Sequence, residues 1–98
     1  MILVRDVFQL KFGKAKEAIA LWKEGKEILK KNGHYPNRVL TDLVGKYYTF
    51  ILETTSTNFS EFEESMKTTF KEKAYAEWYQ KFIPLVENGY REIFNIVE

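Results

Sequence analysis

The order in which two hydrophobic periods alternate along the chain constrains its fold more than any other feature. Apolar residues recur at every third or fourth position in residues 14–32 and again from Ser60 to Phe82, so both segments are predicted to be amphipathic helices. Four other segments have the period-two alternation or the β-branched and aromatic content of strands: residues 2–12, 34–44, 46–54 and 90–98. The predicted order is therefore β-α-β-β-α-β.

Two features define the first predicted helix. Lys30 and Lys31, followed by Asn32-Gly33, are typical of a helix C-terminus, where cations and a residue that accepts the left-handed conformation are favoured. Gly25 lies on the apolar stripe, where glycine costs about 1 kcal/mol relative to alanine. We therefore expect either a close approach of the helix backbone to the sheet at Gly25, or a gap that something else fills.

The second predicted helix also carries local signals at its ends. Ser60 and Glu63 have the spacing of a capping box, which predicts Ser60 as the N-cap. Pro84 should end or bend the helix because proline lacks the amide donor, and a kink is expected near residues 71–73. Asn88-Gly89 is predicted to be a turn before the closing strand.

These elements predict one α+β domain over residues 1–98. Crossovers of helical length imply parallel strand pairings with right-handed connections. The short link at Gly45-Lys46 makes residues 34–44 and 46–54 an antiparallel hairpin. The simplest sheet that satisfies both is ferredoxin-like, with the first and third strands central and both helices on one face.

The predicted strands are apolar on both sides, although the helices cover only one face. On the first strand, for example, Leu3 and Val7 lie opposite the stronger apolar face, and on the third strand Tyr47 and Ile51 lie opposite Phe50. So large an apolar face is uncommon in monomers. We therefore expect a homodimer in which two sheets pack face to face, with a different protein partner as the alternative.

Several local sequence features accompany this order of elements. The first strand ends in Leu10-Lys11-Phe12-Gly13, the first helix carries Trp22, and the tail runs from Tyr75 through Trp78 and Pro84 to Ile93. In these respects the chain resembles the dimeric α+β barrel proteins, and among them the NIPSNAP-like small proteins.

The resemblance covers the whole chain and implies a homodimeric α+β barrel. Members of that superfamily include cofactor-independent monooxygenases, stress-response proteins and haem enzymes, so the fold by itself implies no single activity. The typical NIPSNAP first strand carries Glu and Arg at alternate positions, where this chain has Val4 and Asp6.

Composition excludes several classes of protein. The formal net charge is +1, which provides no field to attract nucleic acid or anionic lipid, so neither partner is expected. The chain has no cysteine, which fits a cytoplasmic protein and removes thiolate nucleophiles and Cys-based zinc sites. No segment approaches the roughly 20 apolar residues of a membrane span. We expect neither a metal nor a cofactor.

Asp6 and His34 are the candidate catalytic residues. Asp6 lies in the middle of the first strand on its more apolar side, where an unpaired carboxylate is costly. It is either a polar anchor or general base in a cleft between helices and sheet, or it pairs with Arg38, with Arg91 or with a donor across the dimer. His34, the only histidine, is either an acid-base group or a residue of a surface turn.

Trp22, Tyr48 and Trp78 are the candidate ligand-binding residues. They would line a hydrophobic cleft that holds a small apolar or aromatic molecule. The alternative is that they belong to the core and the interface. Arg5, together with Arg38 and Arg91, would bind an anion or would form ion pairs with Glu53, Asp42 and Glu92.

These observations favour a small homodimer that binds an apolar or aromatic molecule and could act as a cofactor-independent monooxygenase. The alternative is an oligomerisation or interaction module without catalysis. A single-stranded RNA binder is the least favoured, because residues 45–51 only partly match the RNA-reading strand of RRM domains and the order of Gly45 and Lys46 is reversed.

Overall fold

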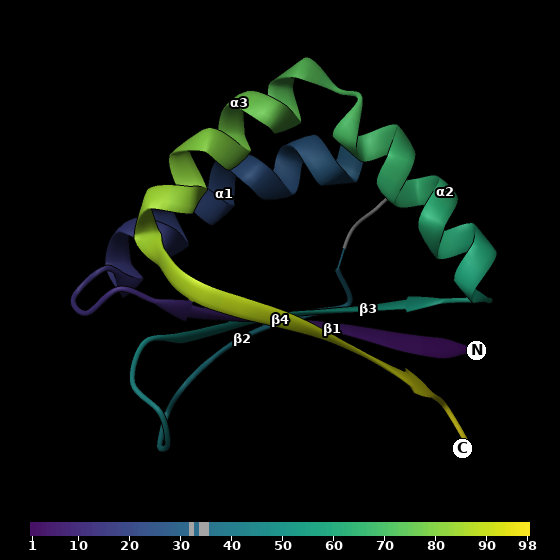
Figure 1. The fold of residues 1–98 in the computed structure, drawn as a ribbon, viewed down its shortest axis with the longest axis horizontal. Helices are drawn as coiled ribbons and strands as arrows, with labels where there is room; N and C mark the ends of the chain where they lie inside the picture. The colour runs from purple at the N-terminus through teal and green to yellow at the C-terminus, as the bar shows by residue number, and fades with distance from the viewer. Residues whose placement is uncertain (32, 34–35) are drawn as a thin grey trace.

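The computed structural model describes residues 1–31, 33 and 36–98. Within these residues it contains one sheet of four strands, and all the helices lie on one face of that sheet (Figure 1). The elements in chain order are β1 (Ile2–Leu10), α1 (Ala15–Lys31), β2 (Arg38–Thr41), β3 (Thr49–Ser56), α2 (Phe59–Phe70), α3 (Lys73–Phe82), a 3-10 turn (Ile83–Leu85) and β4 (Val86–Asn95). The predicted α+β, ferredoxin-like class is confirmed.

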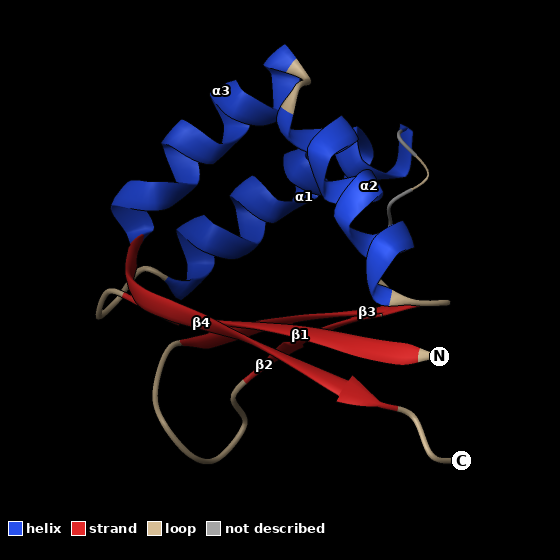
Figure 2. Cartoon of the chain, turned by 45° about the vertical axis from the view of Figure 1, so that its right-hand side comes forward, coloured by secondary structure: helices blue, strands red, loops and turns tan. Residues whose placement is uncertain are grey.

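The strand order is β2-β3-β1-β4, so the first and third strands are central as predicted. All three pairings between described strands are antiparallel, including the β2–β3 hairpin. The expected parallel pairings are therefore wrong. Each helical crossover does join strands that run the same way, but another strand lies between them: β3 separates β1 from β2, and β1 separates β3 from β4. Figure 2 shows the resulting two layers of helices and sheet.

The second predicted helix is two helices, because the expected kink near residues 71–73 is a complete break. The N-cap of α2 is Asn58, whose side-chain oxygen accepts a hydrogen bond of 2.9 Å from the amide of Glu61. The capping box at Ser60 is therefore wrong. The chain enters the helix two residues earlier because the amide side chain of Asn58 already satisfies a free N–H of the first turn.

The predicted turn at Asn88-Gly89 is also wrong, since both residues lie inside β4. The chain returns to the sheet through the 3-10 turn around Pro84 instead. Gly89 pairs with Phe8 across the strands, and a Cβ at Gly89 would lie 3.1 Å from the Val7 carbonyl oxygen. Glycine is used here for close packing, not for a turn.

The core lies between the sheet and the helices and is rich in aromatic rings. Trp22 of α1 and Trp78 of α3 pack with Phe50 of β3 and Phe82 of α3, and all four are buried. Gly25 lets the two helices meet, because a Cβ at this position would lie 2.5 Å from Cε2 of Trp78. The close approach expected at Gly25 is thus made to a neighbouring helix and not to the sheet.

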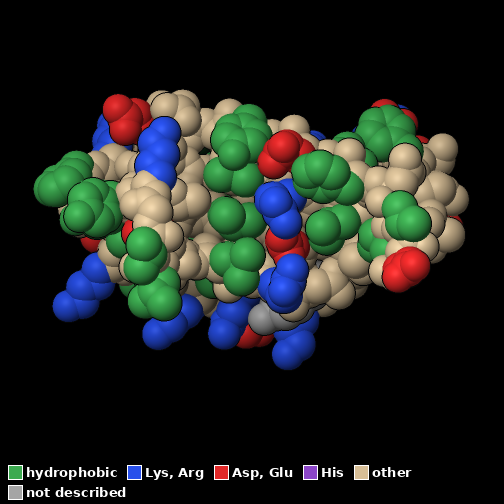
Figure 3. All heavy atoms as spheres, turned by 90° about the horizontal axis from the view of Figure 1, so that it is seen from below, with side chains coloured by type: hydrophobic (Ala, Val, Ile, Leu, Met, Phe, Trp, Pro, Cys, Tyr) green, Lys and Arg blue, Asp and Glu red, His purple; other side chains and the backbone are tan. Residues whose placement is uncertain are grey.

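The opposite face of the sheet has no covering element among the described residues. Figure 3 looks onto this face and shows apolar side chains on both sides of a line of acidic and basic ones. The loop between β2 and β3 curls beneath the sheet, and its Leu43 and Val44 side chains are 96% and 92% exposed (Figure 1).

Candidate ligand-binding site

A partly enclosed cavity of about 270 Å³ lies between the helices and the inner face of the sheet. Aromatic residues form a large part of its wall, including Phe8, Trp22, Phe70, Tyr75, Trp78, Tyr79 and Phe82. They reach it because α1 and α3 turn their apolar stripes toward the sheet, while β1 contributes every second residue. A wall of apolar and aromatic side chains with a few polar groups is the usual composition of a small-molecule site.

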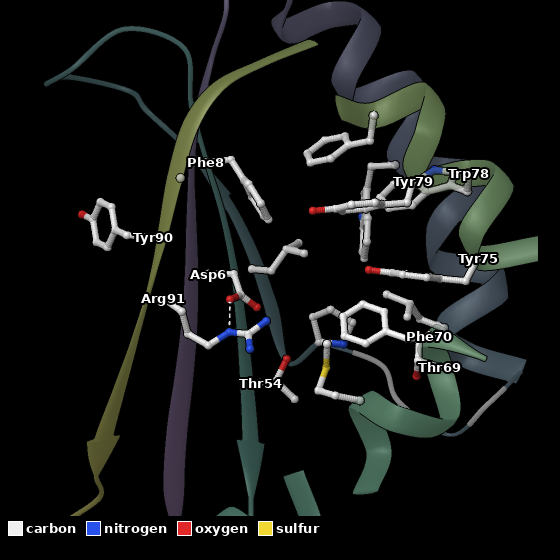
Figure 4. A pocket seen from close by; sticks show the side chains of 17 residues that line it. Asp6, Phe8, Thr54, Thr69, Phe70, Tyr75, Trp78, Tyr79, Tyr90 and Arg91 are labelled. Carbon is white, nitrogen blue, oxygen red and sulfur yellow. Dashed lines mark hydrogen bonds and ion pairs between the residues drawn. The ribbon is translucent and has the colours of Figure 1, made fainter. Parts of the chain in front are cut away.

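The polar end of the cavity is formed by Asp6 on β1 and Arg91 on β4. These residues are directly opposite each other in the antiparallel pair, so both side chains project from the inner face. Arg91 Nε donates a hydrogen bond to Asp6 Oδ1 over 2.5 Å (Figure 4). The Arg91 guanidinium also lies over the ring of Phe62, 5.1 Å from its centroid. Of the two alternatives for Asp6, the structure therefore supports the ion pair with Arg91.

Tyr75 and Tyr79 face this ion pair from the helix layer. They are one turn apart on α3, and their rings stack with centroids 5.9 Å apart and an interplanar angle of 16°. Their hydroxyls point into the cavity toward Asp6 (Figure 4). Neither hydroxyl has a hydrogen-bond partner among the described residues, which leaves both available to a bound molecule.

The Tyr75 phenol is held in its protonated form. Burial raises the pKa of Tyr75 to about 12, and the nearby charges of Tyr79 and Asp6 act in the same direction, while Arg91 opposes them. At neutral pH the hydroxyl of Tyr75 is therefore a hydrogen-bond donor that faces the carboxylate end of the cavity.

The predicted site residues are only partly brought together. Asp6, Trp22 and Trp78 line the cavity. Tyr48 lies outside it, in the loop before β3, where its backbone has a φ of 59° and its ring meets that of Phe12 at 4.8 Å. The Tyr48 carbonyl accepts a hydrogen bond from the amide of Leu10, so this residue anchors the loop. His34 lies outside the described residues.

Sequence reasoning missed Tyr75, which carries a free hydroxyl, as a site residue. Its i, i+4 spacing to Tyr79, beside the same spacing of Trp78 and Phe82, was visible as an apolar face of the helix. Arg91 was one of several possible partners of Asp6, because the register that sets it opposite Asp6 cannot be read before the strand order is known.

Among the described residues, no group of three or more His, Cys, Asp or Glu side chains is placed to hold a metal ion. In the same part of the chain, no helix is both long enough and apolar enough to cross a membrane.

Comparison with solved structures shows the same architecture in other proteins. A NIPSNAP family protein from Agrobacterium tumefaciens superposes with a TM-score of 0.93 at 14% identity, covering 99% of this chain and 93% of that one. An uncharacterised NIPSNAP domain protein from Burkholderia xenovorans gives 0.92 at 12% identity, covering 99% and 95%. This chain has the NIPSNAP fold. The predicted resemblance is confirmed at the level of the fold.

The NIPSNAP fold also overlaps with that of a second group. A putative antibiotic biosynthesis monooxygenase from Nitrosomonas europaea superposes with a TM-score of 0.75 at 12% identity, covering all of both chains. No protein-family model and no curated protein sequence matches this chain. At these identities the likeness extends to the fold alone.

Proposed function

We propose that the protein binds a small aromatic molecule that carries a hydroxyl group, in the cavity between the helices and the sheet. The observation that carries this proposal is the meeting of the Asp6–Arg91 pair with the unbonded hydroxyl of Tyr75 at one end of a cavity that is otherwise mostly apolar. The ring of the ligand would lie among Trp22, Trp78 and Phe82, and its hydroxyl would lie at the polar end.

The size of the cavity limits the ligand. A cavity of about 150 Å³ is known to hold benzene, and sites for drug-sized molecules begin near 300 Å³. The volume of about 270 Å³ found here suits one ring with substituents, or two fused rings.

The charges at the polar end favour a neutral hydroxyl over a carboxylate. Asp6 balances the positive charge of Arg91, and its second carboxylate oxygen has no hydrogen-bond partner among the described residues. A hydroxyl can donate to that oxygen and accept from Tyr75 at the same time. A ligand carboxylate would instead face the carboxylate of Asp6 and be repelled by it.

Catalysis is a second candidate, supported by the position of Asp6. A carboxylate within reach of a ligand hydroxyl can act as its general base, and a phenolate is readily oxidised. In an oxygenase without cofactor, a phenol and O₂ would give a quinone and water, with O₂ as the oxidant. The likeness of the fold to the monooxygenases agrees with this candidate. If no turnover occurs, binding alone, or the non-catalytic interaction module, is the function.

We also propose the cytoplasm as the compartment. The chain has no cysteine, and proteins of the reducing cytoplasm rarely contain disulfides.

Fluorescence titration tests the binding proposal directly, because Trp22 and Trp78 line the cavity. The probes are 2-naphthol, naphthalene and 2-naphthoate, which share their rings and differ in the polar group. We expect saturable quenching by all three and tightest binding for 2-naphthol. Equal affinities would overturn the hydroxyl preference, and no saturable quenching by any probe would overturn the proposal.

A pair of variants shows whether the probe binds in this cavity. Thr54→Phe places a ring in the cavity from β3 and should abolish quenching, while Thr57→Phe adds the same ring at an exposed position beyond β3 and should not.

An oxygen electrode with 1-naphthol as substrate tests the second candidate, catalysis. If the wild-type protein consumes O₂ and Asp6→Asn does not, catalysis is supported. If the wild-type protein consumes no O₂, catalysis is rejected for this class of substrate.

A further inference from the structure

The guanidinium of Arg91 has unused donors at the polar end of the cavity. Its Nε donates to Asp6, but neither of its terminal nitrogens has a hydrogen-bond partner among the described residues. The ring of Phe62 lies against one face of the guanidinium, which fixes the plane in which these nitrogens lie. The Arg91 side chain is 41% exposed, so the free N–H groups are accessible to a bound molecule.

Thr54 of β3 lies on the same face of the sheet, close to this ion pair. The register pairs Thr54 with Val4, two residues before Asp6 on β1, so the Thr54 side chain projects from the inner face and is diagonal to Asp6. Thr54 lines the cavity, and its hydroxyl has no hydrogen-bond partner among the residues that the structure describes. In Figure 4 this hydroxyl points toward the guanidinium of Arg91.

The donors and acceptors at this end exceed what one ligand hydroxyl can use. In the proposed function, the ligand hydroxyl donates to Asp6 and accepts from Tyr75. The terminal nitrogens of Arg91 and the hydroxyl of Thr54 then remain without a partner. A second hydroxyl on the ligand would accept from Arg91 and donate to Thr54. A carbonyl oxygen would accept from Arg91 but would bring no proton to the acceptors.

The two sets of polar groups adjoin each other. Asp6 belongs to the first set and Arg91 to the second, and the two side chains are joined by a hydrogen bond of 2.5 Å. A ligand reaches both sets at once when its two oxygens are on neighbouring carbons of one ring. A second hydroxyl at the far end of the ring system would instead lie among apolar side chains such as Trp22 and Trp78, where an unpaired hydroxyl is costly.

We propose that the cavity selects aromatic molecules of the catechol type, which carry hydroxyl groups on two neighbouring ring carbons. Asp6 and Tyr75 bind the first hydroxyl, and Thr54 and Arg91 bind the second. This inference rests on the proposed function and narrows its ligand class. It adds Thr54 and the terminal nitrogens of Arg91 as the groups that determine specificity.

Isomeric diols test the neighbouring position of the two hydroxyls. The probes are 2-naphthol, naphthalene-2,3-diol, whose hydroxyls are adjacent, and naphthalene-2,7-diol, whose hydroxyls are on different rings. Isothermal titration calorimetry measures all three without relying on their fluorescence. We expect the 2,3-diol to bind at least about tenfold more tightly than 2-naphthol, because it gains hydrogen bonds that include one to a charged group. The 2,7-diol should bind no more tightly than 2-naphthol.

The outcomes separate this inference from the proposed function on which it rests. If 2-naphthol binds and the 2,3-diol binds no more tightly than either 2-naphthol or the 2,7-diol, the catechol preference is overturned and the proposed function stands. If none of the three probes binds, the proposed function itself fails.

A methyl ether tests whether the second oxygen must be a hydroxyl. In 3-methoxy-2-naphthol the second oxygen can still accept from Arg91, but it has no proton to donate to Thr54. We expect its affinity to be close to that of 2-naphthol. An affinity equal to that of the 2,3-diol would show that an acceptor alone is recognised and would overturn the assignment of a second hydroxyl.

Thr54→Val tests the acceptor side of the second hydroxyl. Valine keeps the shape of the side chain and removes its oxygen, so the tenfold advantage of the 2,3-diol over 2-naphthol should fall to about threefold or less. Thr41→Val, the same change at an exposed position of β2 that does not line the cavity, should leave the advantage intact. An unchanged advantage in Thr54→Val would overturn the role of Thr54.

Arg91→Lys tests the donor side. Lysine keeps a positive charge beside Asp6, but it lacks the planar fork that holds the carboxylate and a second oxygen at the same time. The advantage of the 2,3-diol should again fall to about threefold or less. Arg38→Lys on β2, which does not line the cavity, is the control. If Arg91→Lys keeps the full advantage, the terminal nitrogens of Arg91 do not bind the second oxygen and the inference is wrong.

Discussion

Gly25 of α1 lies directly against the indole ring of Trp78 of α3, and this contact sets the distance between the two helices. The indole N–H of Trp78 donates a hydrogen bond of 2.8 Å to the carbonyl oxygen of Leu21, one turn before Gly25. The same ring forms part of the cavity wall. The shape of the candidate site therefore depends on the absence of a side chain at one position of a neighbouring helix.

The first prediction follows from this contact. Gly25→Ala would ordinarily stabilise a helix by about 1 kcal/mol. Here the new methyl group would overlap the Trp78 ring, so we expect a net loss of about 1–3 kcal/mol in the free energy of unfolding, the usual cost of overpacking. Urea denaturation measures it. The control is Ala20→Gly at an exposed position of the same helix, which should cost about 1 kcal/mol. A stabilised Gly25→Ala protein would contradict the packing seen here.

The second prediction separates the role of Asp6 in binding from its role in stability. The Asp6–Arg91 pair is partly exposed, and pairs of this kind contribute about 0–1 kcal/mol to stability. Asp6→Asn should therefore change the urea midpoint little. It should lower the affinity for 2-naphthol by roughly tenfold, because a charge-assisted hydrogen bond becomes a neutral one. The affinity for naphthalene should not change. A parallel loss for both probes would indicate a distorted cavity instead.

The third prediction concerns the Tyr75 hydroxyl. Tyr75→Phe removes one donor and leaves the stacked ring in place, so 2-naphthol should bind roughly three- to tenfold more weakly. Spectrophotometric titration gives a second measurement on the same variant. The wild-type protein should show one tyrosine that ionises near pH 12, and the variant should lack this step. If the ionisation near pH 12 persists in Tyr75→Phe, another tyrosine carries the raised pKa.

The fourth prediction is a pH dependence that arises from Glu53. Burial raises the pKa of this carboxyl, but hydrogen bonds from Arg38 and Arg5 and their positive charges outweigh burial and hold the pKa below the ordinary value of 4.5. A lowered pKa in the folded state adds stability above pH 4.5, and this contribution is lost as the pH falls through the folded-state pKa.

Glu53→Gln is the comparison for this effect. We expect the wild-type protein to exceed the variant in free energy of unfolding at pH 7, and this difference to shrink steadily when urea denaturation is repeated at pH 5, 4 and 3. A difference that is constant across this range would show that the ionised form of Glu53 has no special role in stability.

The sequence carried enough information for the fold but not for the site. The helical and strand periods reflect which residues can be buried on one face, so they predicted the elements, the central strands and the side that the helices cover. The break between α2 and α3 was foreseen as a kink near residues 71–73. The parallel pairings were wrong because crossover length reports strand direction and says nothing of which strands are neighbours.

The site depends on long-range relationships that have no local signal. Asp6 and Arg91 are 85 residues apart, and only the β1–β4 register brings them together. Tyr48 was proposed for the site because it is aromatic and lies in the predicted strand 46–54. Its positive φ places it in a loop, where its ring packs against Phe12. Trp22 and Trp78 could be foreseen because each lies on the buried stripe of its helix.

β1 separates the cavity on the inner face of the sheet from the outer face. Its even-numbered residues, such as Asp6, face the cavity, while its odd-numbered residues, such as Arg5 and Val7, face outward. A one-residue insertion or deletion in this strand would exchange the two sets. The strand should therefore tolerate substitution at single positions far better than any change in length. In a library of variants with a longer or shorter β1, we expect no folded protein in which one of the two faces is intact and the other is disrupted.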